Sequence, residues 1–210
     1  MRSQRGSGTK QGGAEQRTSD HAREMGADPD RAPPFFFTKP ADAVVASGST
    51  LLFPSQTVDL HHEAELVVAL GSGGRDIAVA DAAGAIFGWA VGIDLTRRDL
   101  QAAAKKAGRP WDMAKGFDNS APVGPLRLGI PPVGRLVTLE VGSARRQTGD
   151  LADMIWNVGE INATLSTYVA LAAGDLLFTG TPAGVGPIYR GDTVIGSIVG
   201  AKPIEVTFAR

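Results

Sequence analysis

Leu60-His61-His62-Glu63-Ala64-Glu65-Leu66-Val67-Val68-Ala69-Leu70 is the stretch on which both the fold and the site depend. Its Val- and Leu-rich end predicts a buried strand. Residues two apart in a strand project to one face, so Glu63 and Glu65 would lie side by side. Two carboxylates near a core repel each other and lose hydration, and a divalent cation relieves both costs. An exposed acidic strand end would need no ion, so this stretch alone leaves both interpretations open.

The composition restricts the classes of protein and of site. The chain has 210 residues, a formal net charge of −1, three His and no Cys. Near-neutral charge gives no support to nucleic-acid binding, and without Cys a metal needs oxygen or imidazole ligands. No apolar run approaches the roughly 20 residues of a membrane span, and the N-terminus has no signal-like apolar segment. We therefore expect a cytoplasmic protein without membrane or nucleic-acid partners.

The pattern along the chain predicts one α+β domain over residues 18–210, preceded by a tail. Residues 1–17 are rich in Gly, Ser, Gln and Arg and predict a disordered tail, or one that is not native. We expect turns at 71–75 and 142–149 and an irregular segment at 110–118. Besides 60–70, the predicted strands are 35–39, 43–46, 50–53, 86–94, 136–141, 175–180, 192–199 and 203–208, and the predicted helices are 18–26, 79–85, 97–106 and 157–171.

A third acid follows the predicted strand 86–94. Asp94 lies where that strand gives way to a loop, and Thr96 can cap the next helix. Asp94 could equally be a turn or capping aspartate. With Glu63 and Glu65 it would provide three oxygen ligands and leave open positions for water or substrate, as Mg²⁺ or Mn²⁺ prefers.

Basic residues near these acids could bind the carboxylate of an oxo-acid substrate. Arg98 and Gln101 are three residues apart on the predicted helix 97–106, and Lys115 is flanked by apolar residues. Lys39 is either an anion contact or an ordinary surface lysine, and we favour the surface position. The Gly/Pro-rich turn that starts at Thr181 could present backbone N–H groups to an anion, or be a plain tight turn.

His21 and Glu24 form a possible acid–base pair. On the helix predicted for 18–26 they would be neighbours, and the carboxylate would fix the tautomer of the imidazole and raise its basicity. A solvated pair on a surface turn is the alternative.

Six motifs resemble the fumarylacetoacetate hydrolase family, in particular its short acylpyruvate and fumarylpyruvate hydrolases. They occur in the family's order over about residues 20–210. The motifs are His21-Ala22-Arg23-Glu24, Phe37-Thr38-Lys39-Pro40, His61-His62-Glu63-Ala64-Glu65, Gly92-Ile93-Asp94-Leu95-Thr96-Arg97-Arg98-Asp99-Leu100-Gln101, Lys115-Gly116-Phe117-Asp118 and Thr179-Gly180-Thr181-Pro182-Ala183-Gly184-Val185-Gly186.

The resemblance implies a mixed β-roll or sandwich with a few flanking helices, usually a homodimer. It also implies roles for individual residues, which fall into three groups. Glu63, Glu65 and Asp94 would bind one Mg²⁺ or Mn²⁺ ion; His21 and Glu24 on a lid-like helix would activate water, with Lys115 beside the metal; and Arg98, Gln101 and Thr181 would contact the substrate.

These roles imply hydrolysis of a C–C bond in a 2,4-diketo acid, such as fumarylpyruvate, to a carboxylic acid and pyruvate, a reaction of aromatic catabolism. Oxaloacetate decarboxylation or keto–enol isomerisation on the same site, or a catalytically impaired relative, are the alternatives. Family members usually enter the His helix from an apolar strand with a Gly-Arg-Asn-Tyr-like turn, whereas residues 1–17 here are Gly- and Gln-rich. Either the chain lacks that strand and a substrate-side Arg, or residues 1–17 are not native. If they are native, we expect reduced activity and a less stable edge of the sheet.

Overall fold

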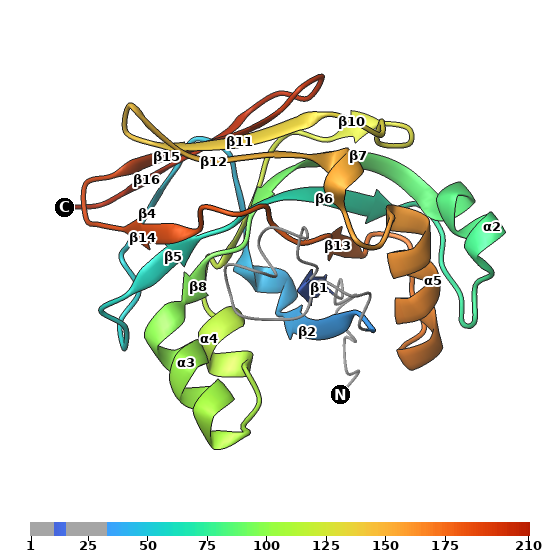
Figure 1. Cartoon of the computed structure of the whole chain (residues 1–210), viewed down its shortest axis with the longest axis horizontal. Coiled ribbons are helices and arrows are strands. Elements are labelled where there is room, and N and C mark those ends of the chain that lie inside the picture. Colours follow the sequence, from blue (N-terminus) through green and yellow to red (C-terminus); the bar gives the residue numbers. More distant parts are fainter. Residues whose placement is uncertain (1–10, 16–32) are drawn as a thin grey trace, which may run out of the picture.

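The structure, a computed structural model, describes residues 11–15 and 33–210 (Figure 1). Strands dominate these residues, and the helices lie at the periphery of the sheets, which confirms the predicted α+β class and mixed sheet architecture. No helix within the described part of the chain is both long and apolar enough to cross a membrane.

The largest sheet contains the strand predicted from the opening stretch. Its order is β2 (Phe35–Lys39), β1 (Gln11–Glu15), β13 (Leu176–Phe178), β6 (Ala64–Leu70), β7 (Ile86–Ile93), β9 (Ala121–Val123) and β3 (Val44–Ala46), with β10 (Arg127–Leu128) also paired to β7. Every residue of β6 is buried. A strand covered on both faces has a continuous apolar run instead of alternation, and this is the pattern of β6.

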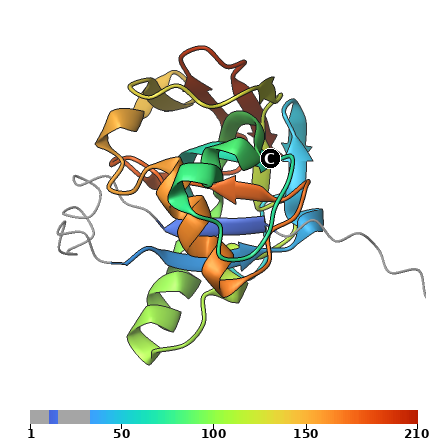
Figure 2. The same ribbon diagram turned by 90° about the vertical axis from the view of Figure 1, so that its right-hand side faces the viewer.

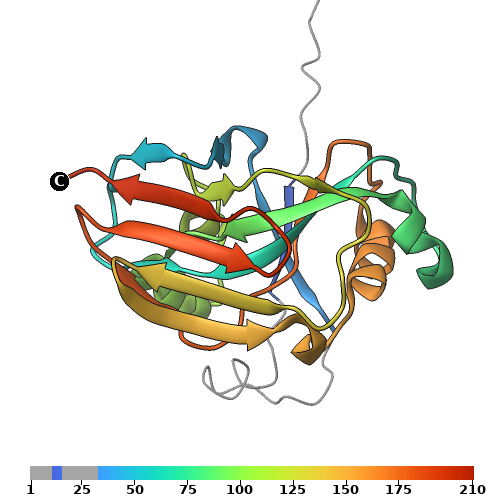
Figure 3. The ribbon, with the colours of Figure 1, turned by 90° about the horizontal axis from the view of Figure 1, so that it is seen from above.

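A second sheet lies across β6 and β7, as Figures 1 and 3 show from two directions. Its order is β12 (Ala144–Asp150), β11 (Leu136–Val141), β15 (Thr193–Ile198), β16 (Ile204–Phe208) and β4 (Ser49–Leu51). The main apolar core joins Leu66 and Val91 of the first sheet to Leu139 and Val206 of the second. A small third sheet adjoins the start of β6. Its order is β14 (Gly186–Ile188), β5 (Leu60–His62) and β8 (Thr96–Arg97).

The helices have the ends that local sequence dictates. Asn157 and Glu160 form a reciprocal capping box at the start of α5 (Val158–Tyr168), and Gly108, at φ +62°, ends α3 (Arg98–Ala107). The remaining helical segments are α2 (Val79–Ala82), α4 (Asp112–Lys115) and the 3₁₀ turns Ala41–Ala43, Ala83–Ala85 and Leu151–Asp153.

The prediction of a disordered tail over residues 1–17 is wrong for Gln11–Glu15, which form β1. This strand runs parallel to β13 and antiparallel to β2, beside which it lies in Figure 2. Because strand pairing uses backbone N–H and C=O groups, a Gly-rich segment can take this place without an apolar side-chain pattern. The alternative in which the chain has lost a strand here is therefore wrong as well. The rest of the predicted tail lies outside the described residues.

Three local predictions also need correction. Residues 144–150, all but the last of which lie in the predicted turn 142–149, form β12, and the irregular segment 110–118 contains α4. Most of β12 is polar because it is an edge strand with one exposed face. Thr96 caps no helix, since it lies in β8 and α3 starts from Arg97 without a side-chain cap.

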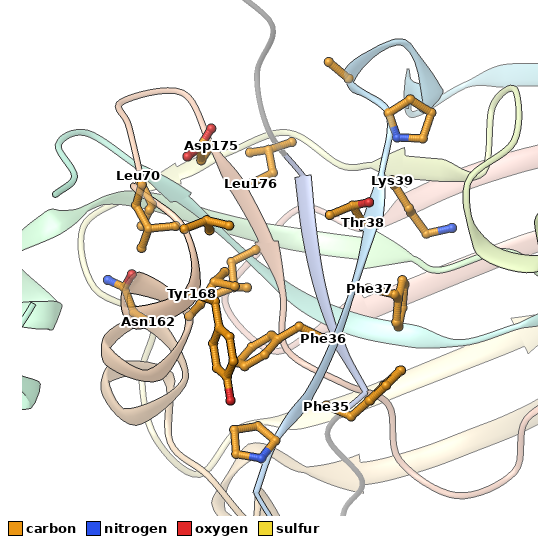
Figure 4. Close-up of a pocket in the computed structure, with 17 residues that line it drawn as sticks. Phe35, Phe36, Phe37, Thr38, Lys39, Leu70, Asn162, Tyr168, Asp175 and Leu176 are labelled. Atoms are coloured by element: carbon orange, nitrogen blue, oxygen red, sulfur yellow. The ribbon is translucent and has the colours of Figure 1, made fainter. Parts of the chain in front are cut away.

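A cavity of about 670 Å³ opens between α5 and the strands β2 and β13 (Figure 4). Leu165, Leu177 and Phe36 are among its apolar lining residues, and Figure 4 shows Phe36 and Thr38 on the α5 side of β2. None of the three candidate acids lines it. Lys39 is among its lining residues, so the cavity adjoins the strand that carries Lys39 but does not contain the acids.

Candidate active site

The structure brings the three predicted acids together in the interior. Glu63 lies between β5 and β6, Glu65 lies on β6, and Asp94 follows β7; all three are buried. One carboxylate oxygen from each lies within 4.8 Å of the others. The antiparallel pairing of β6 with β7 produces this arrangement, and the Asp94 N–H donates to the Glu63 carbonyl at 2.8 Å.

Lys115 bridges two of these acids. Its Nζ atom lies 2.7 Å from Glu63 Oε2 and 2.7 Å from Asp94 Oδ2, and it also donates to Thr96 Oγ1 at 2.7 Å. Burial opposes its charge, but Asp94 and Glu63 outweigh that effect and raise the pKa of Lys115 above its usual value. Lys115 is therefore a fixed positive charge and not a proton acceptor.

Lys39 is a second buried cation, and the preferred surface position for it is wrong. Only 3% of the residue is exposed. Its Nζ lies 2.7 Å from Asp94 Oδ1, close enough for an ion pair though not aligned as a hydrogen bond, and it donates to the Ser120 carbonyl at 3.0 Å. Strand β2 presents alternate residues to this side, where Lys115 Nζ also lies 4.8 Å from the ring centre of Phe37.

Arg98 is the third cation. Its guanidinium donates to Glu63 Oε1 and to Gln101 Oε1, and its Nε donates to His61 Nδ1 at 3.3 Å. Burial alone would raise the pKa of Glu63, but Lys115 and Arg98 hold it well below the usual range. The Glu63 carboxylate is therefore fully ionised and compensated.

Glu65 lacks comparable compensation. Its Oε2 accepts a hydrogen bond from the Gly180 N–H at 2.7 Å, but no Lys, Arg or His among the described residues pairs with it. Burial raises the pKa of Glu65, and the neighbouring charges of Asp94 and Glu63 raise it further. A buried carboxylate next to two others is an unfavourable arrangement that a divalent cation would relieve. The donor set, three converging carboxylates, fits Mg²⁺ or Mn²⁺.

Two of the predicted substrate contacts, Gln101 and Thr181, differ in whether a hydrogen-bonding group is available to a ligand. The Gln101 side chain is buried, and its Nε2 has no hydrogen-bond partner among the residues that the structure describes. Thr181 is buried too, but its hydroxyl donates to the Ala64 carbonyl at 2.9 Å and accepts from Gln147 Nε2 at 2.8 Å. Gln101 therefore has a donor available, whereas the Thr181 hydroxyl is already used to hold the strand that carries the acids.

The remaining predicted residues, His21 and Glu24, lie outside the residues that the structure describes. Sequence reasoning missed Gln147 and misjudged Lys39. Alternation along β2 from Phe37 would have placed Lys39 on the side of the acids. For Gln147, in a polar edge strand, no local signal exists.

Comparisons with known proteins agree with this geometry. The model of the fumarylacetoacetate (FAA) hydrolase C-terminal family matches residues 13–208. The chain is 41% identical to a fumarylpyruvate hydrolase of Ralstonia sp over 176 residues, which cover 82% of this chain and 91% of that protein. It is also 41% identical to an oxaloacetate tautomerase of Escherichia coli over 180 residues, covering 82% of this chain and 80% of the relative.

A solved structure shares both fold and sequence. The fumarylpyruvate hydrolase of Pseudomonas aeruginosa, crystallised with Mn²⁺ and pyruvate, superposes with a TM-score of 0.89 at 47% identity, over 96% of this chain and 89% of that one. The matched range includes all three acids and the strand β6 that carries Glu65. By sequence, fold and the convergence of its buried acids, the chain belongs to the fumarylacetoacetate hydrolase family.

Proposed function

We propose that this protein hydrolyses a C–C bond in a 2,4-diketo acid, with fumarylpyruvate as the first candidate substrate, and releases pyruvate in a metal-dependent reaction. The observation that carries the proposal is the buried group of Glu63, Glu65 and Asp94 bridged by Lys115. The 47% identical Pseudomonas aeruginosa enzyme, whose structure contains Mn²⁺ and pyruvate, supports it.

A cation held by Glu63, Glu65 and Asp94 would act as a Lewis acid towards the oxygens of a bound oxo-acid. The local charges indicate what kind of ligand accompanies it. With all three acids ionised, as cation binding requires, three carboxylates face three cationic side chains, Lys39, Lys115 and Arg98, and their charges cancel. A dication then needs about two negative charges from its ligand. A substrate carboxylate supplies one, and the charge that develops on oxygen as the C–C bond breaks supplies the other.

Lys115 and Gln101 have complementary roles in this proposal. Lys115, protonated and buried, places a fixed positive charge beside the acids, where it stabilises negative charge developing on a substrate oxygen. Gln101 Nε2 is buried and has no partner within the described part of the chain, and it donates to the substrate carboxylate. Arg98 holds Gln101 through its amide oxygen and thereby orients that donor.

Hydrolysis also needs a base, and the proposal assigns it to His21 oriented by Glu24. His21 takes a proton from water as the hydroxyl adds to the distal carbonyl carbon. The C–C bond then breaks, its electron pair passes to the pyruvate portion, and protonation of that carbon gives pyruvate. The hydroxyl oxygen stays in the carboxylic acid product, fumarate in the case of fumarylpyruvate.

Oxaloacetate keto–enol tautomerisation is the second candidate. The 41% identical Escherichia coli relative is an oxaloacetate tautomerase, and proton transfer between carbon and oxygen needs the same oxo-acid site but no attacking water. Oxaloacetate decarboxylation, which would release CO₂, shares those requirements.

Product analysis separates these reactions. Mn²⁺-loaded protein is incubated with fumarylpyruvate and with enol-oxaloacetate, and pyruvate, fumarate, CO₂ and the enol absorbance are followed. We expect equal amounts of fumarate and pyruvate from fumarylpyruvate, and their loss in Glu65→Gln. Decay of the enol absorbance without pyruvate or CO₂ would support the tautomerase instead. No turnover of either substrate by protein that binds Mn²⁺ would point to an impaired enzyme.

Two further expectations belong to the proposal. We expect Mg²⁺ to support the reaction too. The test removes metal from the protein with a chelator, reloads it with Mg²⁺ or Mn²⁺, and compares the activities. The homodimer stays a prediction from the family resemblance, and sedimentation equilibrium tests it.

A further inference from the structure

We infer that Gln147 is a positioning residue that holds the acid-bearing strand and the Thr181 turn in register, so that a cation binds tightly. The inference rests on the proposed function, because it takes the three acids as the cation ligands. Gln147 comes from β12 in the second sheet, and only 1% of it is exposed. It is thus a buried amide from one layer inserted next to the site of another.

All hydrogen-bonding atoms of this amide face fixed partners. Gln147 Oε1 accepts from the Ala64 N–H at 3.0 Å and lies 3.0 Å from His62 Nδ1. Its Nε2 donates to Thr181 Oγ1 at 2.8 Å and to the Pro182 carbonyl at 2.9 Å. A backbone N–H can only donate and a carbonyl can only accept, so these two partners fix which end of the amide carries oxygen. It follows that His62 Nδ1 carries a hydrogen.

The contacts form a closed ring around the residue between two of the acids. Ala64 separates Glu63 from Glu65; its N–H is held by Gln147, and its carbonyl accepts from Thr181 Oγ1 at 2.9 Å. The same turn supplies the Gly180 N–H that binds the Glu65 carboxylate. Gln147 therefore acts on both acids through the peptide groups on either side of Ala64.

The ring lies where strand pairing is interrupted. Strand β5 ends at His62 and β6 starts at Ala64, so Glu63 lies at the change from one sheet to another. At this point the Ala64 N–H bonds to a side-chain oxygen. Where backbone pairing between strands is interrupted, the chain is freer to rotate. The hydrogen bond to the buried side-chain amide of Gln147 fixes its orientation.

Backbone packing shows that β12 and the turn have to approach closely for this contact. A Cβ atom on Gly149 would lie 2.5 Å from Pro182 Cβ, and one on Gly184 would lie 2.2 Å from the Arg146 carbonyl oxygen. Gly184 also has φ +94°, a conformation that favours glycine. A glycine on β12 and a glycine in the turn thus allow the two segments to approach each other at Gln147. This close approach supports a specific role for Gln147 over general packing.

A residue that only packs would affect stability, whereas a residue that orients ligands also affects cation affinity. Loss of partners that orient metal ligands typically weakens metal binding about 10- to 100-fold. The test compares wild type with Gln147→Leu and Thr181→Val, which remove the amide and the hydroxyl at similar volume. Thr148→Val, on the exposed side of the same strand, is the matched control.

Mn²⁺ dissociation constants of chelator-treated protein are measured by calorimetry, alongside Tm and far-ultraviolet circular dichroism. We expect Mn²⁺ to bind about 10- to 100-fold more weakly to folded Gln147→Leu, with unchanged binding to Thr148→Val. The double variant Gln147→Leu/Thr181→Val should bind no more weakly than the worse single variant, because both break one ring. If Gln147→Leu does not fold, Thr181→Val provides the same comparison.

A lower Tm with unchanged Mn²⁺ affinity in Gln147→Leu and Thr181→Val would overturn the positioning role while leaving the proposed function intact. If the losses of Mn²⁺ affinity in the two single variants add up in the double variant, Gln147 and Thr181 do not act through one hydrogen-bonded ring. Wild-type protein that binds no Mn²⁺ would overturn the proposed function itself, and the positioning role with it.

Discussion

Lys39 Nζ lies 2.7 Å from Asp94 Oδ1, and both side chains are almost completely buried. Lys39 comes from β2, which reaches the rest of its sheet through β1. The N-terminal strand, unremarkable in sequence, therefore holds a buried cation against one of the three acids. The first part of the chain contributes to the site through backbone pairing.

Replacement of Lys39 by Met should cost about 3 kcal/mol of unfolding free energy, because removal of one partner leaves a buried charge less compensated. Lys115 still pairs with Asp94, so the protein should remain folded. Urea unfolding measures the effect, with Lys106→Met on an exposed position of α3 as the control. A loss no larger than that of the control would contradict the buried ion pair.

Glu65→Gln should leave the metal-free protein at least as stable as wild type, because burial and two like charges raise the pKa of Glu65. A raised pKa means that wild type gains stability from the protonated acid at low pH and loses it as the pH rises, while Gln does not titrate. The stability difference in favour of the variant should therefore grow with pH. Chemical unfolding with chelator across a pH series checks this, and a difference that shrinks with pH is the opposing result.

Mn²⁺ should stabilise the wild-type protein by mass action, by about 2.7 kcal/mol at a free concentration 100 times its Kd. The three acids supply the binding energy, so Glu65→Gln should show little of this stabilisation at the same concentration. Thermal unfolding with and without Mn²⁺ gives both values. Equal stabilisation of the two proteins would place the cation elsewhere.

Gly12→Val should stabilise the protein by about 1 kcal/mol, since Gly weakens a strand and cavity filling commonly gains this amount. Gly12 pairs with Thr38 and with Leu177, and both line the cavity beside α5 (Figure 4). Directly paired residues project to one face, so the new side chain would enter that cavity.

Gly13→Val is the matched control for that substitution. Gly13 pairs with Phe37, whose ring centre lies 4.8 Å from Lys115 Nζ and which Figure 4 shows on the other side of β2 from Thr38. The control should gain no stability and should reduce turnover. Denaturant midpoints of the two variants decide the matter, and a gain at Gly13 with none at Gly12 would reverse the assignment of faces.

Gln101→Leu should raise KM for the oxo-acid substrate about 10-fold with a smaller change in kcat, because a hydrogen bond to a charged group contributes about 1.5 kcal/mol or more. Steady-state kinetics with saturating Mn²⁺ measure both constants. Gln101→Leu should bind Mn²⁺ as wild type does, since Gln101 contacts Arg98 and none of the acids. An unchanged KM would remove Gln101 from the substrate contacts.

Sequence alone determined the elements whose signal is local. The apolar run after Glu65 specified the buried strand β6, and the predicted helices 97–106 and 157–171 correspond to α3 and α5. The positions of Glu63, Glu65 and Asp94, together with the ordered motifs, led to the family that the comparisons show. These features could be read because side-chain period, caps and motif order act over a few residues at a time.

Only the tertiary structure decided the roles of β1, Lys39, Thr96 and Gln147. Strand β1 pairs through its backbone, so its side chains carry no signal of it. Lys39 is buried because β2 is brought against Asp94, 55 residues later in the sequence, and Thr96 accepts from Lys115 instead of capping a helix. Gln147 reaches Ala64 across two sheets. The burial and the partner of each depend on contacts between distant segments, and the free energy that favours them arises only when the sheets pack together.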